Sequence, residues 1–108
     1  MTLVFVYLPL FERTAGGLLT DEDMQTIENQ LLANPRAGAV IPGTGGVRKL
    51  RVGFAGRGKS GSGRLIYLYG ANKARIYFIL LYPKNRMANL SGAQKLQMRQ
   101  LVKQIEDE

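Results

Sequence analysis

The sequence predicts an α+β domain with a mainly antiparallel sheet of about four strands, N-terminal helices and a C-terminal helix. Runs rich in β-branched and aromatic residues occur at 2–8 and 75–82, and a proline follows each. Apolar residues repeat at helical spacing in 21–33 and 92–106, and a capping motif precedes each segment. Because three predicted strands follow one another, we expect a meandering sheet with the helices packed on one face.

The N-terminal third contains one strand and one clear helix. Residues 10–19 are ambiguous, because a short helix could begin near Phe11 and would end at the following pair of glycines. The helix at 21–33 begins after Thr20, whose hydroxyl can cap it, and Asp23 has the position of the reciprocal acid. Asn34 and Pro35 end this helix, and residues 36–46 form a turn-rich connector.

The middle of the chain predicts a sheet. Two alternating runs, 47–54 and 64–69, flank a loop composed mainly of glycines and cations. A tight turn at 70–73 leads to the nearly continuous apolar run 75–82, which is typical of a central strand. A chain of 108 residues is long enough for one domain, so we expect a single domain over 1–108.

The composition excludes several classes of chemistry. The chain has no Cys and no His, which rules out disulfides, a thiolate nucleophile, the usual zinc sites and histidine acid–base catalysis. We therefore expect no metal and no cofactor. No apolar run reaches the roughly 20 residues of a membrane span, and no signal peptide is recognisable, so we expect a cytoplasmic protein without a membrane partner.

The charges are distributed unevenly. The net charge is +7, yet no Asp or Glu occurs between Glu28 and Glu106, where 14 of the 15 cations lie. A basic stretch of this length without any acid indicates a surface that binds a polyanion.

Strand alternation gathers some of these cations. Lys49 and Arg51 share one parity and so should lie on one face of the sheet, whereas Arg48 has the other parity. The hairpin should bring Arg57, Lys59 and Arg64 near Lys49 and Arg51. Such a surface is suited to phosphate groups. Residues 53–60 fit the pattern GxxxxGKS, but glycines and a strand follow instead of a helix, which argues against nucleotide hydrolysis.

Four segments resemble those of HigB-type toxins in the RelE/ParE superfamily. They are PGTGGVRKLRV at 42–52, GRGKSG at 56–61 with the following Arg64, YPKN at 82–85 and NLS at 89–91. The resemblance implies a RelE-like fold and a bacterial type II toxin that cuts mRNA on the ribosome. It also implies a cognate antitoxin, which we expect to be a helix-turn-helix DNA-binding protein. The chain departs from the family pattern at Arg86, which stands where Glu is usual, and at Asn89, which stands where Asp is usual.

RNA carries its own nucleophile, the 2′-OH, so a ribonuclease needs a proton acceptor, charge stabilisation and in-line geometry. Fixed cations can stabilise the phosphorane, and Arg64 is the first candidate for that role. A lysine could accept the proton, and Tyr82 could donate one or orient the substrate. The predicted catalytic residues are Arg64, Lys84, Tyr82, Lys49 and Lys59, and the predicted RNA-binding residues are Arg51, Arg57, Asn85 and Arg48. Two alternatives stay open: a non-catalytic RNA- or ribosome-binding domain, and a ParE-like toxin directed at gyrase.

Overall fold

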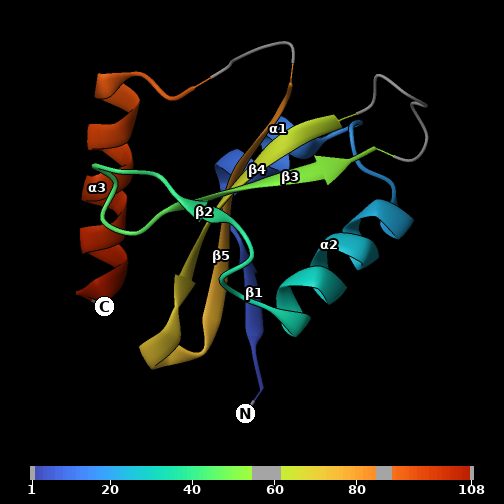
Figure 1. Cartoon of the computed structure of the whole chain (residues 1–108), viewed down its shortest axis with the longest axis horizontal. Helices are drawn as coiled ribbons and strands as arrows, with labels where there is room; N and C mark the ends of the chain where they lie inside the picture. Colours follow the sequence, from blue (N-terminus) through green and yellow to red (C-terminus); the bar gives the residue numbers. More distant parts are fainter. Residues whose placement is uncertain (1, 55–61, 85–88, 108) are drawn as a thin grey trace.

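The computed structural model describes residues 2–54, 62–84 and 89–107 (Figure 1). The chain begins with β1 (Val4–Tyr7), α1 (Pro9–Ala15), α2 (Asp21–Ala33) and β2 (Ala39–Val40). It continues with β3 (Arg48–Gly53), β4 (Ser62–Gly70), a 3₁₀ turn (Ala71–Lys73), β5 (Arg75–Pro83) and α3 (Gly92–Glu106). Among the described residues, no helix combines the length and the apolarity that a membrane crossing requires.

The strands form one sheet in the order β1-β5-β4-β3-β2. β1 runs parallel to β5, and the other neighbouring pairs are antiparallel. The predicted α+β class and mainly antiparallel sheet are confirmed. The structure has five strands where we expected about four, because two residues of the connector, Ala39 and Val40, pair with Lys49 and Arg48.

The helices lie on both faces of the sheet, so the expectation of one helical face is wrong (Figure 1). α1 and α2 pack with one apolar cluster, and α3 packs with a second. Along β4, Leu65 belongs to the first cluster and Ile66 to the second. Both faces of the central strands are therefore buried, which explains the nearly continuous apolar run of β5.

Both capping motifs form as predicted. At the start of α2, Thr20 Oγ1 accepts a hydrogen bond from the Asp23 backbone N–H at 3.0 Å, and the Asp23 carboxylate accepts one from the Thr20 N–H at 3.0 Å. Ser91 and Gln94 make the same reciprocal pair at the start of α3, at 3.1 and 2.8 Å. These caps satisfy backbone donors that a helix leaves free at its first turn, and they fix where α2 and α3 begin.

The turn between β2 and β3 has a structural reason for its glycines. Three of them have positive φ: Gly43 (+83°), Gly45 (+80°) and Gly46 (+114°). Thr44 is fully buried, and its Oγ1 donates to the Ile41 carbonyl at 2.6 Å and accepts from the Val47 N–H at 3.1 Å. A Cβ on Gly45 would lie 3.5 Å from Val102 Cγ1, so this turn packs directly against α3.

β5 contains one irregularity. Ile66 of β4 pairs with Leu80, but the next residue, Tyr67, pairs with Phe78, so Ile79 has no partner across the strands. This arrangement is a β-bulge. Tyr67 also ties the sheet to the connector, since its hydroxyl donates to the Pro35 carbonyl at 2.8 Å and accepts from the Gly38 N–H at 2.9 Å.

Candidate functional site

A transverse row of three polar residues crosses the sheet near one end. Arg51 of β3 pairs with Arg64 of β4, and Arg64 pairs with Tyr82 of β5. Directly opposed residues of antiparallel strands point to the same side, with Cβ atoms roughly 4.5–5.5 Å apart. Like charges in that position are destabilising. The opposed guanidiniums of Arg51 and Arg64 therefore create a place where an anion would relieve the repulsion.

Lys49 extends this row along β3. It precedes Arg51 by two residues, so both side chains lie on one face, as strand parity predicted. Lys49 pairs with Ile66, which packs in the cluster that contains Met98 and Val102 of α3. We call the surface formed by Lys49, Arg51, Arg64 and Tyr82 the basic face. It lies on the side of the sheet that α3 covers.

The hydroxyl of Tyr82 is buried in the basic face. The side chain is 5% exposed, and its hydroxyl has no hydrogen-bond partner among the described residues. Burial raises the pKa of the Tyr82 hydroxyl above its usual value of 10, and the positive charge of Arg64 opposes this by a smaller amount. The phenol is therefore protonated at neutral pH, in the state that can donate a proton.

Arg64 is half-buried beside Tyr82. Its Nη1 donates to the carbonyl of Gly63 at 3.2 Å, which holds the guanidinium against its own strand. A guanidinium has five N–H donors in a planar fork, so beside this bond it has donors that can bind the oxygens of a phosphate in two places.

Lys84 lies at the end of β5, where its side chain is exposed. Its backbone N–H donates to the Ser62 carbonyl at 3.0 Å, so Lys84 sits beside the first residues of β4 and close in sequence to Tyr82. The other predicted residues of this region, Lys59, Arg57 and Asn85, lie outside the described residues.

The sequence model of the RelE toxin of the RelE/RelB toxin–antitoxin system matches residues 10–108. The chain belongs to the RelE toxin family. It is thus the toxin of a toxin–antitoxin pair and has a cognate antitoxin, and toxins of this family are generally endoribonucleases. The matched segment begins in α1 and includes all four residues of the basic face.

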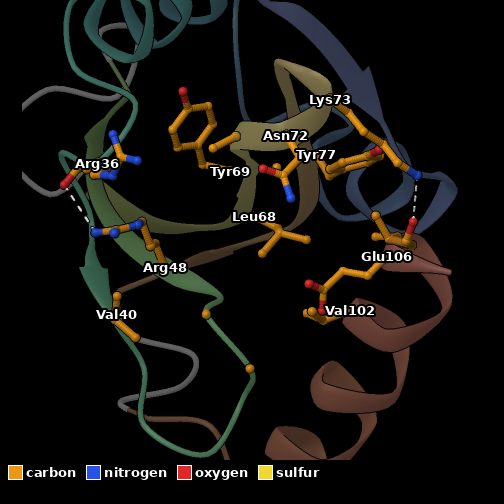
Figure 2. A pocket seen from close by; sticks show the side chains of 15 residues that line it. Arg36, Val40, Arg48, Leu68, Tyr69, Asn72, Lys73, Tyr77, Val102 and Glu106 are labelled. Atoms are coloured by element: carbon orange, nitrogen blue, oxygen red, sulfur yellow. Dashed lines mark hydrogen bonds between the residues drawn. The ribbon is translucent and has the colours of Figure 1, made fainter. Parts of the chain in front are cut away.

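The predicted RNA-binding residue Arg48 lies elsewhere in this RelE-family protein. Its side chain has the parity opposite to Lys49, and its Nη1 donates to the carbonyls of Gly38 at 2.8 Å and Arg36 at 3.3 Å. Arg48 lines a cavity of about 370 Å³ between the end of β4 and the last turns of α3 (Figure 2). A role for Arg48 in RNA binding stays a prediction.

The polar groups of this second cavity are largely engaged within the protein. The guanidinium of Arg36 lies 5.0 Å from the centre of the Tyr69 ring, and Lys73 Nζ donates to the Ile105 carbonyl at 3.0 Å (Figure 2). Glu106 adds a carboxylate to the lining. The basic face, in contrast, contains no acid. Its positive charge is therefore less compensated than that of the second cavity.

Two residues near the basic face escaped the sequence interpretation. Asn89 differs from the family pattern without indicating a role, and the sequence does not distinguish Lys95 from the other cations of the last helix. The structure brings both close to Lys49 across a cavity that β2 and the start of α3 share. The local sequence does not distinguish Lys95 from Arg99 or Lys103. Lys95 differs because its side chain lies against the turn at Gly43, which is distant in the sequence.

The described residues offer little to a metal ion. Within residues 2–54, 62–84 and 89–107, no three His, Cys, Asp or Glu side chains gather closely enough to hold one. The acids of the sequence occur only up to Glu28 and from Glu106 onward, so none belongs to the strands of the basic face. The chemistry available at this face is that of guanidinium, ammonium and phenol groups.

Proposed function

We propose that this protein is a HigB-type toxin that cleaves mRNA on the bacterial ribosome without a metal ion, through attack of the 2′-OH. The observation that carries the proposal is the row Arg51–Arg64–Tyr82, in which two opposed cations lie beside a buried, protonated phenol. An RNA phosphate bound there would meet charge stabilisation and a proton donor together.

The reaction needs no nucleophile from the protein. The 2′-oxygen attacks the adjacent phosphorus, the bond to the 5′-oxygen breaks, and a 2′,3′-cyclic phosphate remains. Arg64 stabilises the negative charge that grows on the phosphorane, and Arg51 holds the same phosphate from the neighbouring strand. Tyr82 gives its proton to the leaving 5′-oxygen, which its protonated state supports.

The proton of the 2′-OH requires an acceptor. We assign this role to the amine of a lysine of the basic region, and Lys59 and Lys84 are the candidates. Lys49 stands on the same face as Arg64, roughly 7 Å along β3 from Arg51, and is placed to bind the RNA as a cation. A site without histidine or carboxylate is an incomplete catalyst, and a ribosome that holds the mRNA in an in-line geometry would supply what it lacks.

The experiment compares Arg64→Ala with Arg75→Ala in a reconstituted translation reaction. Arg75 is an exposed cation at the start of β5, so its removal changes the net charge equally without touching the basic face. We expect Arg64→Ala to lower the rate of mRNA cleavage by at least about 10²-fold, as for one lost transition-state contact, and Arg75→Ala to retain it. Melting curves verify that both variants fold.

Other outcomes would favour the rival functions. A wild-type protein that binds ribosomes and blocks translation without producing cut mRNA would be a binding domain. Inhibition of gyrase supercoiling with intact mRNA would indicate a ParE-like toxin. Equal cleavage by wild type and a folded Arg64→Ala variant would remove Arg64 from the mechanism.

We further propose that the antitoxin is a helix-turn-helix DNA-binding protein with an acidic segment for this toxin. The resemblance to HigB-type toxins supports the helix-turn-helix class, and the charge distribution supports the acidic segment, since 14 cations lie between Glu28 and Glu106 without an acid. An acidic partner would associate quickly by electrostatic steering.

A further inference from the structure

A groove adjoins the basic face on the side of β2 and α3. Its volume is about 340 Å³. The polar lining consists of Lys49, Asn89 and Lys95, and the apolar lining includes Val40, Pro42 and Leu90. Within the part of the chain that the structure describes, none of its lining residues is acidic. Two ammonium groups thus share one concave space with an apolar wall.

Lys95 is held in the groove by the fold. It lies in the first turn of α3, where its backbone N–H donates to the Ser91 carbonyl at 2.9 Å. Its side chain is half-buried, and its Cδ lies 4.0 Å from where a Cβ on Gly43 would be. The apolar stem of the lysine therefore runs beside the β2–β3 turn, an arrangement in which a long side chain buries its stem and keeps its charge accessible.

Asn89 lines the groove together with Lys49 of β3 and Lys95 of α3, and it contacts Lys49. The distance from Lys49 Nζ to Asn89 Oδ1 is 3.5 Å, a long hydrogen bond. A neutral amide can orient the ammonium group and leave its charge intact. An aspartate of the same shape at this position would instead form an ion pair with Lys49.

We infer that this groove is a second phosphate-binding subsite for the RNA strand, with Lys95 and Lys49 as its ligands. The inference rests on the proposed function. The groove is continuous with the basic face through Lys49, so a strand bound at Arg64 and Arg51 continues along β3 toward the start of α3. The apolar wall, in which Val40 is 49% exposed, accommodates a base or ribose beside that phosphate.

Three variants test this subsite: Lys95→Gln, Asn89→Asp and, as a control, Lys103→Gln. Each lowers the net charge by one, the two lysine variants by removing a cation and Asn89→Asp by adding an anion. Lys103 is an exposed residue in the last turn of α3 and lies outside the groove. The probe is a single-stranded RNA with 2′-O-methyl groups, which cannot be cleaved, and its affinity is measured at several salt concentrations.

For Lys95→Gln, one lost phosphate contact should reduce the slope of log affinity against log salt by about 0.7. The advantage of wild type over this variant should accordingly shrink about 2.6-fold between 50 and 200 mM salt, a fourfold change in concentration. Asn89→Asp should weaken binding at least as much, because it pairs Lys49 internally. Lys103→Gln should keep the wild-type slope. In the ribosome assay, Lys95→Gln should raise KM and leave kcat near the wild-type value.

The possible outcomes distinguish a failure of this inference from a failure of the proposed function. If wild type neither binds the probe nor cuts mRNA, the proposed function fails. If Arg64→Ala abolishes cleavage while Lys95→Gln and Asn89→Asp bind RNA like Lys103→Gln, the subsite is refuted and the function stands. If these two variants lose the antitoxin and retain RNA, the groove is a protein-docking site and the inference is overturned.

Discussion

Replacing Tyr82 by Phe should stabilise the protein and impair its activity. The substitution keeps the ring, which is packed among the apolar residues under α3, and removes only the hydroxyl. That hydroxyl is buried without a partner among the described residues. A buried polar group that lacks a hydrogen bond costs about 1–3 kcal/mol of folding free energy, so its removal should recover that amount.

The stability effect is large enough to measure. For a chain of 108 residues, the unfolding entropy corresponds to a shift in Tm of about 4 °C for each kcal/mol. Tyr82→Phe should therefore raise Tm by roughly 4–12 °C. Tyr77→Phe is the matched control, because the Tyr77 hydroxyl is also buried without a partner among the described residues but lines the second cavity. It should raise Tm similarly.

Activity should separate the two variants. If Tyr82 protonates the leaving 5′-oxygen, Tyr82→Phe should slow single-turnover mRNA cleavage by about 10²–10⁴-fold, the usual contribution of a general acid. Tyr77→Phe should cleave at the wild-type rate. A Tyr82→Phe protein that cuts mRNA normally would refute the assignment of Tyr82 as the acid. A fall in Tm for both variants would show that the hydroxyls are hydrogen-bonded.

Two further predictions concern stability. Thr44→Val should lower the free energy of unfolding in a urea titration by about 1–3 kcal/mol, because it leaves the buried Val47 N–H without its acceptor. The control Thr2→Val, at an exposed position, should change the free energy of unfolding little. Equal stability of the two variants would contradict this. Burial is the largest cause of the raised pKa of Tyr7, Tyr67 and Tyr82, so their contribution to stability is complete below the unfolded pKa of about 10 and is lost as pH rises through the folded values. An alkaline unfolding series followed by phenolate absorbance should show this loss, and a stability that does not fall in strong alkali would count against it.

The sequence predicted α2 and α3 well because their signals are local, whereas it left the segment of α1 ambiguous. The capping pairs at Thr20 and Ser91 mark the starts of α2 and α3 without reference to the rest of the chain. The parity of Lys49 and Arg51 likewise follows from the strand itself, and the structure places both on the basic face.

The features that escaped prediction depend on tertiary pairing. β2 has only two residues, both exposed, and it is a strand only because it pairs with β3. A run that is apolar at nearly every position, as in β5, contains no signal for which helix covers which face. Lys95 acquires its place from the turn at Gly43, which is distant in the sequence.

The bulge in β5 decides which residue of that strand faces Arg64. Before it, Phe78 packs toward α1 and α2; after it, Leu81 takes that side and Tyr82 the other. If the same sequence formed β5 without the bulge, side chains would alternate strictly. All even-numbered residues would then face α1 and α2, and Tyr82 would be buried there. The phenol of Tyr82 lies on the basic face because the extra residue, Ile79, reverses the alternation of side chains after it. The bulge is thus as much a determinant of the site as the identity of the residues, because a strand of the same sequence without it would place Leu81 opposite Arg64.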